Sequence, residues 1–209
     1  MASVPEAVPQ EPVRRYSNVA VAFHWITVVL VVAQAIFGFG FHRFSEGALK
    51  AELFTWHKTI GPLILLITLA RLWYRVKNPP PPFTPEIPHW ERVAAVWNHR
   101  LFYTLLIAMP LVGLVAISGD AEEPFTRLVG GIPFPLVPGI SEATADIAGE
   151  VHMVAAWLLI ALILIHIAGA LKNQFINHWR LAGRMPPFRA PGGEKAVIGQ
   201  GSAARRVEG

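Results

Sequence analysis

Long, uninterrupted apolar runs dominate the pattern of this 209-residue chain. Four of them are long enough to cross a hydrocarbon core, which takes about 20 mostly apolar residues in a helix. They run approximately from Val19 to Phe41, Leu53 to Tyr74, Leu101 to Ser118 and Val151 to Ile176. The runs are much longer than strands, and no alternating ten-residue pattern of an outer-membrane barrel separates them. The pattern predicts an all-α fold, an integral membrane four-helix bundle.

The first run also has features of an export signal, because Arg14 and Arg15 precede it. Signal peptides have a short apolar segment that is followed by small residues at a cleavage site. Here the apolar segment is longer and ends in GFGFHRF, which has no such site. We therefore interpret it as a first transmembrane helix, with a cleaved signal as the alternative.

Composition supports a membrane protein and narrows its chemistry. The chain is 53% hydrophobic and only 15% charged, which is far from the balance of a soluble domain. It has no cysteine, and this excludes disulfides, iron–sulfur clusters, thiolate metal sites and covalently attached c-type haem. Any metal ion must be held by His, Met or carboxylate. The net charge of +4 comes from basic residues that flank the helices, so it indicates membrane topology and not nucleic-acid binding.

Lys and Arg fall unevenly on the two sides of the predicted membrane, and short cytoplasmic loops collect them. One side holds fourteen of them: Arg14, Arg15, Arg71, Arg75, Lys77, Arg92, Arg100, Lys172, Arg180, Arg184, Arg189, Lys195, Arg205 and Arg206. The other side has Arg43, Lys50, Lys58 and Arg127 together with Glu46, Glu52, Asp120, Glu122, Glu123, Glu142, Asp146 and Glu150. This asymmetry predicts that both termini are cytoplasmic, which agrees with an even number of spans.

The segments outside the spans differ in character. We expect residues 1–15 to be a disordered N-terminal segment, 16–184 the four-helix domain, and 185–209 a disordered cytoplasmic tail rich in Pro, Gly and Ala. A proline-rich cytoplasmic connector, VKNPPPPFTPEIPHW, follows the second run. The long outer loop, residues 119–150, is acidic at both ends and apolar in the middle. Both a cap on the membrane surface and a plain connector fit this composition.

Histidine is the polar residue that stands out inside the spans. His24, His57, His152 and His166 lie in the runs, whereas the other four histidines fall in loops or at helix ends, namely His42, His89, His99 and His178. Strongly polar side chains in a membrane span are costly and point to function. His24 and His166 match in depth on the inner side, and His57 and His152 match on the outer side. The spacing therefore predicts two cross-helix pairs.

The fourth run carries one member of each pair. From His152 to His166 a helix turns through about 1400° and rises about 21 Å, so both rings project from nearly one face. Two axial imidazoles per site, without a thiolate, suit a six-coordinate b-type haem. A proton relay needs acids beside the histidines, and no acid lies inside a span; a zinc site needs three or four ligands at one depth. Plain packing by the histidines is the remaining alternative.

The same fourteen-residue step indicates what surrounds the haems. Gly38 follows His24 by fourteen residues, at the level of the outer haem, where a porphyrin passes close to backbone. Gly61 and Gly169 lie near His57 and His166, although membrane helices also use glycine for close packing. Arg71 follows His57 by fourteen residues, at the level of the inner haem. It is a candidate partner for a haem propionate or a quinone, or an arginine that only sets topology.

Several of these segments carry a family resemblance. RYSNVAVAFHW, WHKTIGPLILLITLARLWYR, NHRLFYTLLIAMPLVGLVAISG and the His152–His166 spacing resemble the bacterial cytochrome b561 family, from about Arg15 to about Arg184. These are four-helix di-haem proteins related to the b-type subunits of hydrogenases and formate dehydrogenases. The resemblance implies a multi-pass protein of the bacterial inner membrane with two haem b groups. It implies His24 and His166 as ligands of the inner haem, and His57 and His152 of the outer haem.

The resemblance also implies one-electron transfer across the membrane to the quinone pool, with superoxide as a proposed outer donor. Three hypotheses follow. In the first, a superoxide:quinone oxidoreductase (superoxide oxidase) passes electrons from the outer haem to the inner haem and on to ubiquinone or another quinone. In the second, the chain is the cytochrome b anchor subunit of a larger periplasmic dehydrogenase or hydrogenase. In the third, it is a non-redox protein whose histidines only pack.

The expected partners are membrane lipid, a quinone and a periplasmic donor, either superoxide or a redox protein; a homodimer is a further candidate, and nucleic acid is not expected. Lys58 and Arg127 are the outer-side candidates comparable to Arg71. Cationic groups near the outer haem would attract a small anion such as superoxide. The acidic ends of the outer loop argue against such an anion, or else serve a basic soluble partner.

Overall fold

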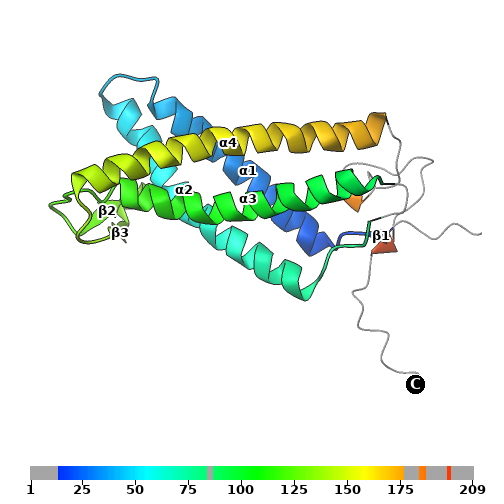
Figure 1. The fold of residues 1–209 in the computed structure, drawn as a ribbon. Helices are drawn as coiled ribbons and strands as arrows, with labels where there is room; N and C mark the ends of the chain where they lie inside the picture. Colours follow the sequence, from blue (N-terminus) through cyan, green and yellow to red (C-terminus); the bar gives the residue numbers. More distant parts are fainter. Residues whose placement is uncertain (1–13, 84–86, 177–183, 187–196, 199–209) are drawn as a thin grey trace, which may run out of the picture.

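Four long helices form the body of the protein. The computed structural model describes residues 14–83, 87–176, 184–186, 197 and 198. The helices are α1 (Asn18–Phe41), α2 (Ala48–Lys77), α3 (His89–Ala116) and α4 (Glu142–Phe175), shown in Figure 1. α1 packs on α2, α3 packs on α4, and α2 also contacts α3. All four are long and apolar enough to cross a membrane, which confirms the predicted four-helix membrane bundle.

The two ends of the bundle carry different small elements (Figure 1). At one end, β2 (Phe125–Arg127) and β3 (Pro133–Pro135) form an antiparallel pair around the short helix η1 (Val129–Gly131). At the other end, β1 (Arg14–Arg15) pairs in parallel with β4 (Val197–Ile198). We call these the hairpin end and the terminal end.

The surface of the helices is apolar, and little of the chain is buried. Val29 of α1 and Leu164 of α4 are 65% and 62% exposed in the middle of their helices. Such side chains are stable on an outer surface when lipid, and not water, surrounds them. The few buried residues of the described chain include Ile60, Ile64 and Thr68 of α2, and Leu159 and Leu162 of α4.

Three helices start earlier than the hydrophobic runs indicated. α2 begins at Ala48 instead of Leu53, α3 at His89 instead of Leu101, and α4 at Glu142 instead of Val151. The added turns contain charged residues, which lower local hydropathy without disfavouring a helix. Ser141 caps α4, since its hydroxyl accepts from the backbone N–H of Thr144 (3.3 Å). Residues 142–150 are therefore helix and not part of a loop.

The rest of the outer loop is a cap that is fastened to the helix ends. The N–H of Val129 donates to the Thr59 hydroxyl (3.0 Å), and the N–H of Val137 donates to the Ser118 hydroxyl (3.0 Å). Lys58 Nζ donates to the hydroxyl of Thr126 in β2 (2.7 Å). The structure thus has a folded cap over the helix ends, and its contact with a membrane surface stays a prediction.

At the terminal end, residues on both sides of position 184 make defined contacts. Arg184 is only 8% exposed, and its Nη1 donates to the carbonyls of Pro81 and Pro82 (3.2 and 2.6 Å). Trp25 Nε1 donates to the carbonyl of Pro186 (2.8 Å). Pro186 and the β1–β4 pair belong to segments 1–15 and 185–209, whose disorder stays a prediction. Apart from Met185, the other residues of these segments lie outside the described part of the chain.

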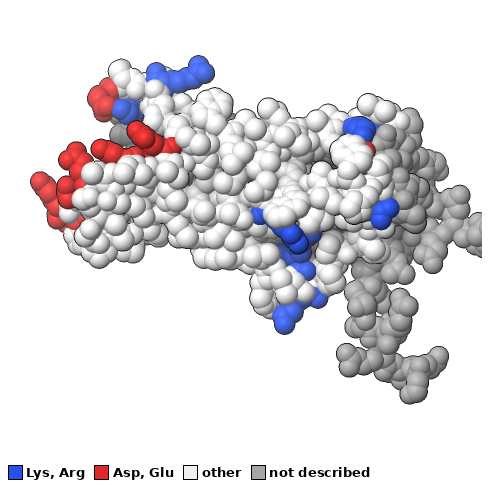
Figure 2. Space-filling view, viewed as in Figure 1, with Lys and Arg blue, Asp and Glu red and all other residues white. Residues whose placement is uncertain are grey.

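Charge separates along the long axis of the bundle (Figure 2). The acidic side chains gather at the hairpin end, over the cap and the start of α4. Among the described residues, the terminal end has a single acid, Glu91, which forms an ion pair with Lys172 (2.7 Å). Its basic residues are Arg14, Arg15, Arg71, Arg75, Lys77, Arg92, Arg100, Lys172 and Arg184.

Candidate functional site

The first histidine pair lies near the hairpin end. His57 of α2 and His152 of α4 face each other with ring centroids 6.0 Å apart and ring planes at 79°. Imidazole nitrogens bind transition metals at about 2 Å, so two rings on opposite sides of one ion have centroids roughly 6 Å apart. The separation of His57 and His152 thus fits two axial ligands of one metal ion.

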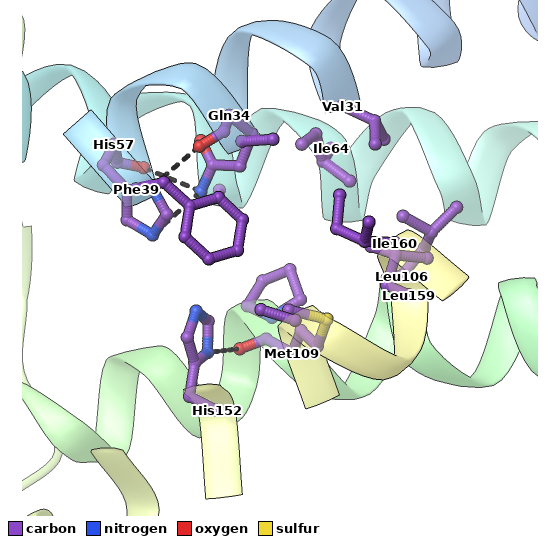
Figure 3. Close-up of a pocket in the computed structure, with 14 residues that line it drawn as sticks. Val31, Gln34, Phe39, His57, Ile64, Leu106, Met109, His152, Leu159 and Ile160 are labelled. Carbon is purple, nitrogen blue, oxygen red and sulfur yellow. Dashed lines mark hydrogen bonds between the residues drawn. The ribbon is translucent and has the colours of Figure 1, made fainter. Parts of the chain in front are cut away.

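Neighbouring helices fix the orientation of both rings, as Figure 3 shows. Nδ1 of His57 lies 3.2 Å from the carbonyl oxygen of Gln34, and Nδ1 of His152 lies 3.0 Å from that of Met109. A carbonyl only accepts, so each Nδ1 carries the proton and each Nε2 keeps its lone pair. This is the tautomer and the outer-shell partner that a metal-binding histidine has in most proteins.

A glycine lies beside each of these rings. A Cβ on Gly38 would come within 2.8 Å of Cε1 of His57, and a Cβ on Gly113 would come within 3.1 Å of Cε1 of His152. Each glycine follows the accepting carbonyl by four residues, Gln34 or Met109, which places carbonyl and glycine on one helix face. The structure places Gly38 beside the His57 ring, and the sequence prediction that it also lies against a porphyrin stays a prediction. Gly113 was not predicted from the sequence.

An apolar cavity opens between the two rings (Figure 3). Its volume is about 80 Å³, and it is lined from all four helices. Its lining includes His57, His152, Gln34 and Phe39 at the hairpin end, and Val31, Ile64, Leu106 and Leu159 deeper in the bundle.

The second pair lies toward the terminal end. The rings of His24 on α1 and His166 on α4 have centroids 6.4 Å apart, with planes at 56°. Arg71 of α2 donates through Nη2 to Nδ1 of His24 (3.4 Å) and lies over the Tyr103 ring at 5.8 Å. The sequence prediction that Arg71 lies at the level of this pair is therefore confirmed. While this hydrogen bond exists, the proton of His24 is on Nε2, so metal binding through Nε2 requires Arg71 to release Nδ1.

His99 is a third imidazole at this level, and the sequence prediction that it lies at a helix end was wrong. It lies inside α3, with its ring centroid 5.5 Å from that of His166. Its Nδ1 donates to the carbonyl of Ala95 (2.7 Å). The signal was available, because His99 precedes Gly113 by fourteen residues, as His24 precedes Gly38. This signal was missed because the hydropathy pattern starts the third span at Leu101, after His99.

The four helices thus repeat one pattern. Gly38, His57, Gly113 and His152 form the level near the hairpin end, and His24, Arg71, His99 and His166 form the level near the terminal end. Seven residues from each level, every helix has one apolar residue: Val31, Ile64, Leu106 or Leu159. All four of these line the cavity. Two polar levels are therefore separated by an apolar layer.

Other candidates from the sequence lie apart from the rings or contact them indirectly. A Cβ on Gly61 would lie 3.6 Å from the side-chain nitrogen of Gln34, an ordinary contact, and one on Gly169 would meet nothing within 4 Å. Arg127 is on the cap, where its Nη1 donates to the carbonyl of Gly131 (3.3 Å). Lys58 follows His57 directly and also lies 5.0 Å from the centre of the Phe54 ring.

Comparison with protein families places these pairs in a known context. Residues 15–187 match the family described as prokaryotic cytochrome b561. The chain belongs to the prokaryotic cytochrome b561 family. Membership establishes a multi-pass protein of the bacterial inner membrane that transports electrons, and haem and quinone follow from the family.

Curated relatives of this cytochrome b561 chain agree. It is 32% identical to cytochrome b561 homolog 2 of Escherichia coli (strain K12), over 78% of this chain and 86% of the relative. It is 28% identical to cytochrome b561 homolog 1 of the same organism, over 84% and 98%. It is 24% identical to the probable superoxide oxidase CybB of Yersinia pestis, over 83% and 97%.

Proposed function

We propose that this cytochrome b561 holds two b-type haems and transfers electrons across the membrane from a periplasmic-side donor to a quinone. The observation that carries the proposal is the repetition of facing imidazoles at two levels, 6.0 Å and 6.4 Å apart. One pair supports one six-coordinate haem, and two pairs on opposite sides of an apolar layer support a path through the membrane.

In this proposal each side chain has a defined task. His57 and His152 hold the haem near the hairpin end, and His24 and His166 hold the haem near the terminal end. When bound, the haem iron supplies the one-electron chemistry. Gly38 leaves space for His57, and Arg71 supplies a cation beside His24 that suits a haem propionate or a quinone oxygen.

The proposal includes an orientation. The terminal end is cytoplasmic, and the hairpin end with its acidic residues is periplasmic. The support is the distribution of Lys and Arg among the described residues, nine at the terminal end and four at the hairpin end. His57 and His152 are therefore the outer ligands, and His24 and His166 are the inner ligands.

Superoxide is the proposed outer donor. The support is the relative that is named a probable superoxide oxidase and the position of Lys58. Lys58 directly follows His57 in the sequence. Its ammonium group donates to the Thr126 hydroxyl, a neutral partner (2.7 Å). A cation without a neutralising carboxylate attracts small anions over several ångströms.

The experiment is a superoxide-driven quinone assay with purified protein in detergent. Superoxide is generated enzymatically, ubiquinone-1 is the acceptor, and quinol formation is followed with and without superoxide dismutase. The proposal predicts quinol formation that dismutase abolishes. If added redox proteins drive quinone reduction and superoxide does not, the donor is a protein and not superoxide. Purification in a stable complex with a dehydrogenase or hydrogenase subunit would instead favour the anchor-subunit role.

A further inference from the structure

Gln34 is a polar side chain in the middle of α1, and none of the roles above includes it. It lies ten residues after His24 and seven before Phe41, so both membrane surfaces are distant. A carboxamide at such a depth is costly unless its polar atoms are paired. Its position on the cavity wall (Figure 3) directs attention to what it contacts.

The contacts of Gln34 all concern one residue. Its backbone carbonyl accepts from Nδ1 of His57 (3.2 Å). Its side-chain nitrogen donates to the carbonyl of His57 (3.1 Å) and lies 3.3 Å from Nε2 of the same ring. Gln34 therefore holds both the ring and the backbone of His57, from a different helix.

The backbone of α2 lacks one helical hydrogen bond next to this contact. Pro62 lies inside the helix and has no N–H to donate to the carbonyl of Lys58, so the turn that contains His57 lacks one of its own hydrogen bonds. The amide of Gln34 adds a donor to this weakened turn. His152, the facing ligand, has a carbonyl and a glycine from α3, but the described residues give it no comparable side-chain partner.

The hydrogen bonds of the Gln34 side chain indicate what changes when a metal ion binds His57. Oε1 of Gln34 is buried and has no hydrogen-bond partner among the described residues. The N–H that faces Nε2 of His57 occupies the lone pair that a metal ion needs. A metal ion bound at Nε2 would take the place of this contact, while the bond to the His57 carbonyl would remain available.

We infer that Gln34 is a positioning residue for His57, which holds the ring and its helix turn ready for the outer haem and has no counterpart at the inner pair. The inference rests on the proposed function, since it assumes that His57 binds haem. It assigns to Gln34 an effect on one haem only. A general packing role would affect both haems, because α1 contributes to both levels.

The test compares Gln34→Met with Thr27→Val in detergent-purified holoprotein. Methionine keeps the length of the side chain and removes the carboxamide. Thr27 is a matched control, because its hydroxyl donates to the Phe23 carbonyl within α1 (2.7 Å). The readouts are the low-spin EPR signal of each haem, and the rate at which each haem transfers to excess apomyoglobin.

We expect Gln34→Met to shift the EPR signal of the outer haem and to speed the transfer of that haem to apomyoglobin. The expected change is roughly tenfold, the lower end of the effects of mutating an outer-shell partner of a metal-bound histidine. The inner haem and both haems of Thr27→Val remain as in the wild type. Unchanged signals in Gln34→Met, or equal loss of both haems, would overturn the inference. Gln34→Asn, which keeps the amide on a shorter stem, should fall between Gln34→Met and the wild type. A wild-type protein with fewer than two haems would count against the proposed function itself.

Discussion

The His57 ring packs against Gly38 so closely that a Cβ at position 38 would lie 2.8 Å from Cε1 of the ring. This distance is shorter than side-chain carbons tolerate, so the ring must move if residue 38 gains a methyl group. Gly38 on α1 therefore constrains His57, a proposed haem ligand on α2.

Gly38→Ala should therefore weaken the outer haem. Because the ring is displaced from the line toward His152, we expect roughly tenfold weaker retention of that haem or more, measured as haem per chain after gel filtration. Gly169→Ala is the control, because a Cβ there meets nothing within 4 Å. Normal haem content in Gly38→Ala would show that the ring is not held where the structure has it.

His99 offers a direct choice between two ligand assignments. Both His24 and His99 lie near His166, with centroids 6.4 and 5.5 Å away, but the larger distance fits opposite sides of one ion. We expect His99→Ala to keep two haems per chain and His24→Ala to lose the inner haem. The reverse result would make His99 the partner of His166.

Arg71 should raise the reduction potential of the inner haem. Its guanidinium is always charged and lies 3.4 Å from His24, so it favours the reduced haem, which has one positive charge fewer. Arg71→Gln should lower the midpoint potential of the inner haem in a spectroscopic redox titration and leave the outer one unchanged. Arg75→Gln, one turn farther from the pair, is the control. An equal shift of both haems would contradict this local effect.

Lys58 tests the proposed superoxide route. Lys58→Glu should slow superoxide-dependent quinone reduction, and the difference from wild type should shrink as salt is added, because screening weakens steering. Lys50→Gln is a matched control, since Lys50 already forms an ion pair with Glu46. A rate that is insensitive to both the charge at position 58 and salt would remove Lys58 from the route.

The fold and the two histidine pairs were predictable because both depend on simple periodicity. Apolar runs give the spans, and the fourteen-residue step between His152 and His166 places two rings on one face. The starts of α3 and α4 were not predictable from hydropathy, because the charged turns before Leu101 and Val151 are helical by propensity, and in α4 also by the Ser141 cap. Because the third span was predicted to start at Leu101, His99 was not recognised as a residue inside a helix.

The details around the rings depended on contacts between helices. Gly38 was found at the correct level, but its role as space for His57 needed the crossing of α1 and α2. Gln34 was missed because its amide is uncharged, and only its position against His57 gives it meaning. The carbonyl of Met109 carries no sequence signal at all, since every residue has one.

The most direct test of the account is a reduced-minus-oxidised spectrum with haem-to-protein stoichiometry, on wild type, His57→Ala and His24→Ala. We expect two b-type haems per wild-type chain and one in each variant, with a different haem lost each time. A colourless wild-type protein after expression with sufficient haem, or two variants that lose the same haem, would contradict it.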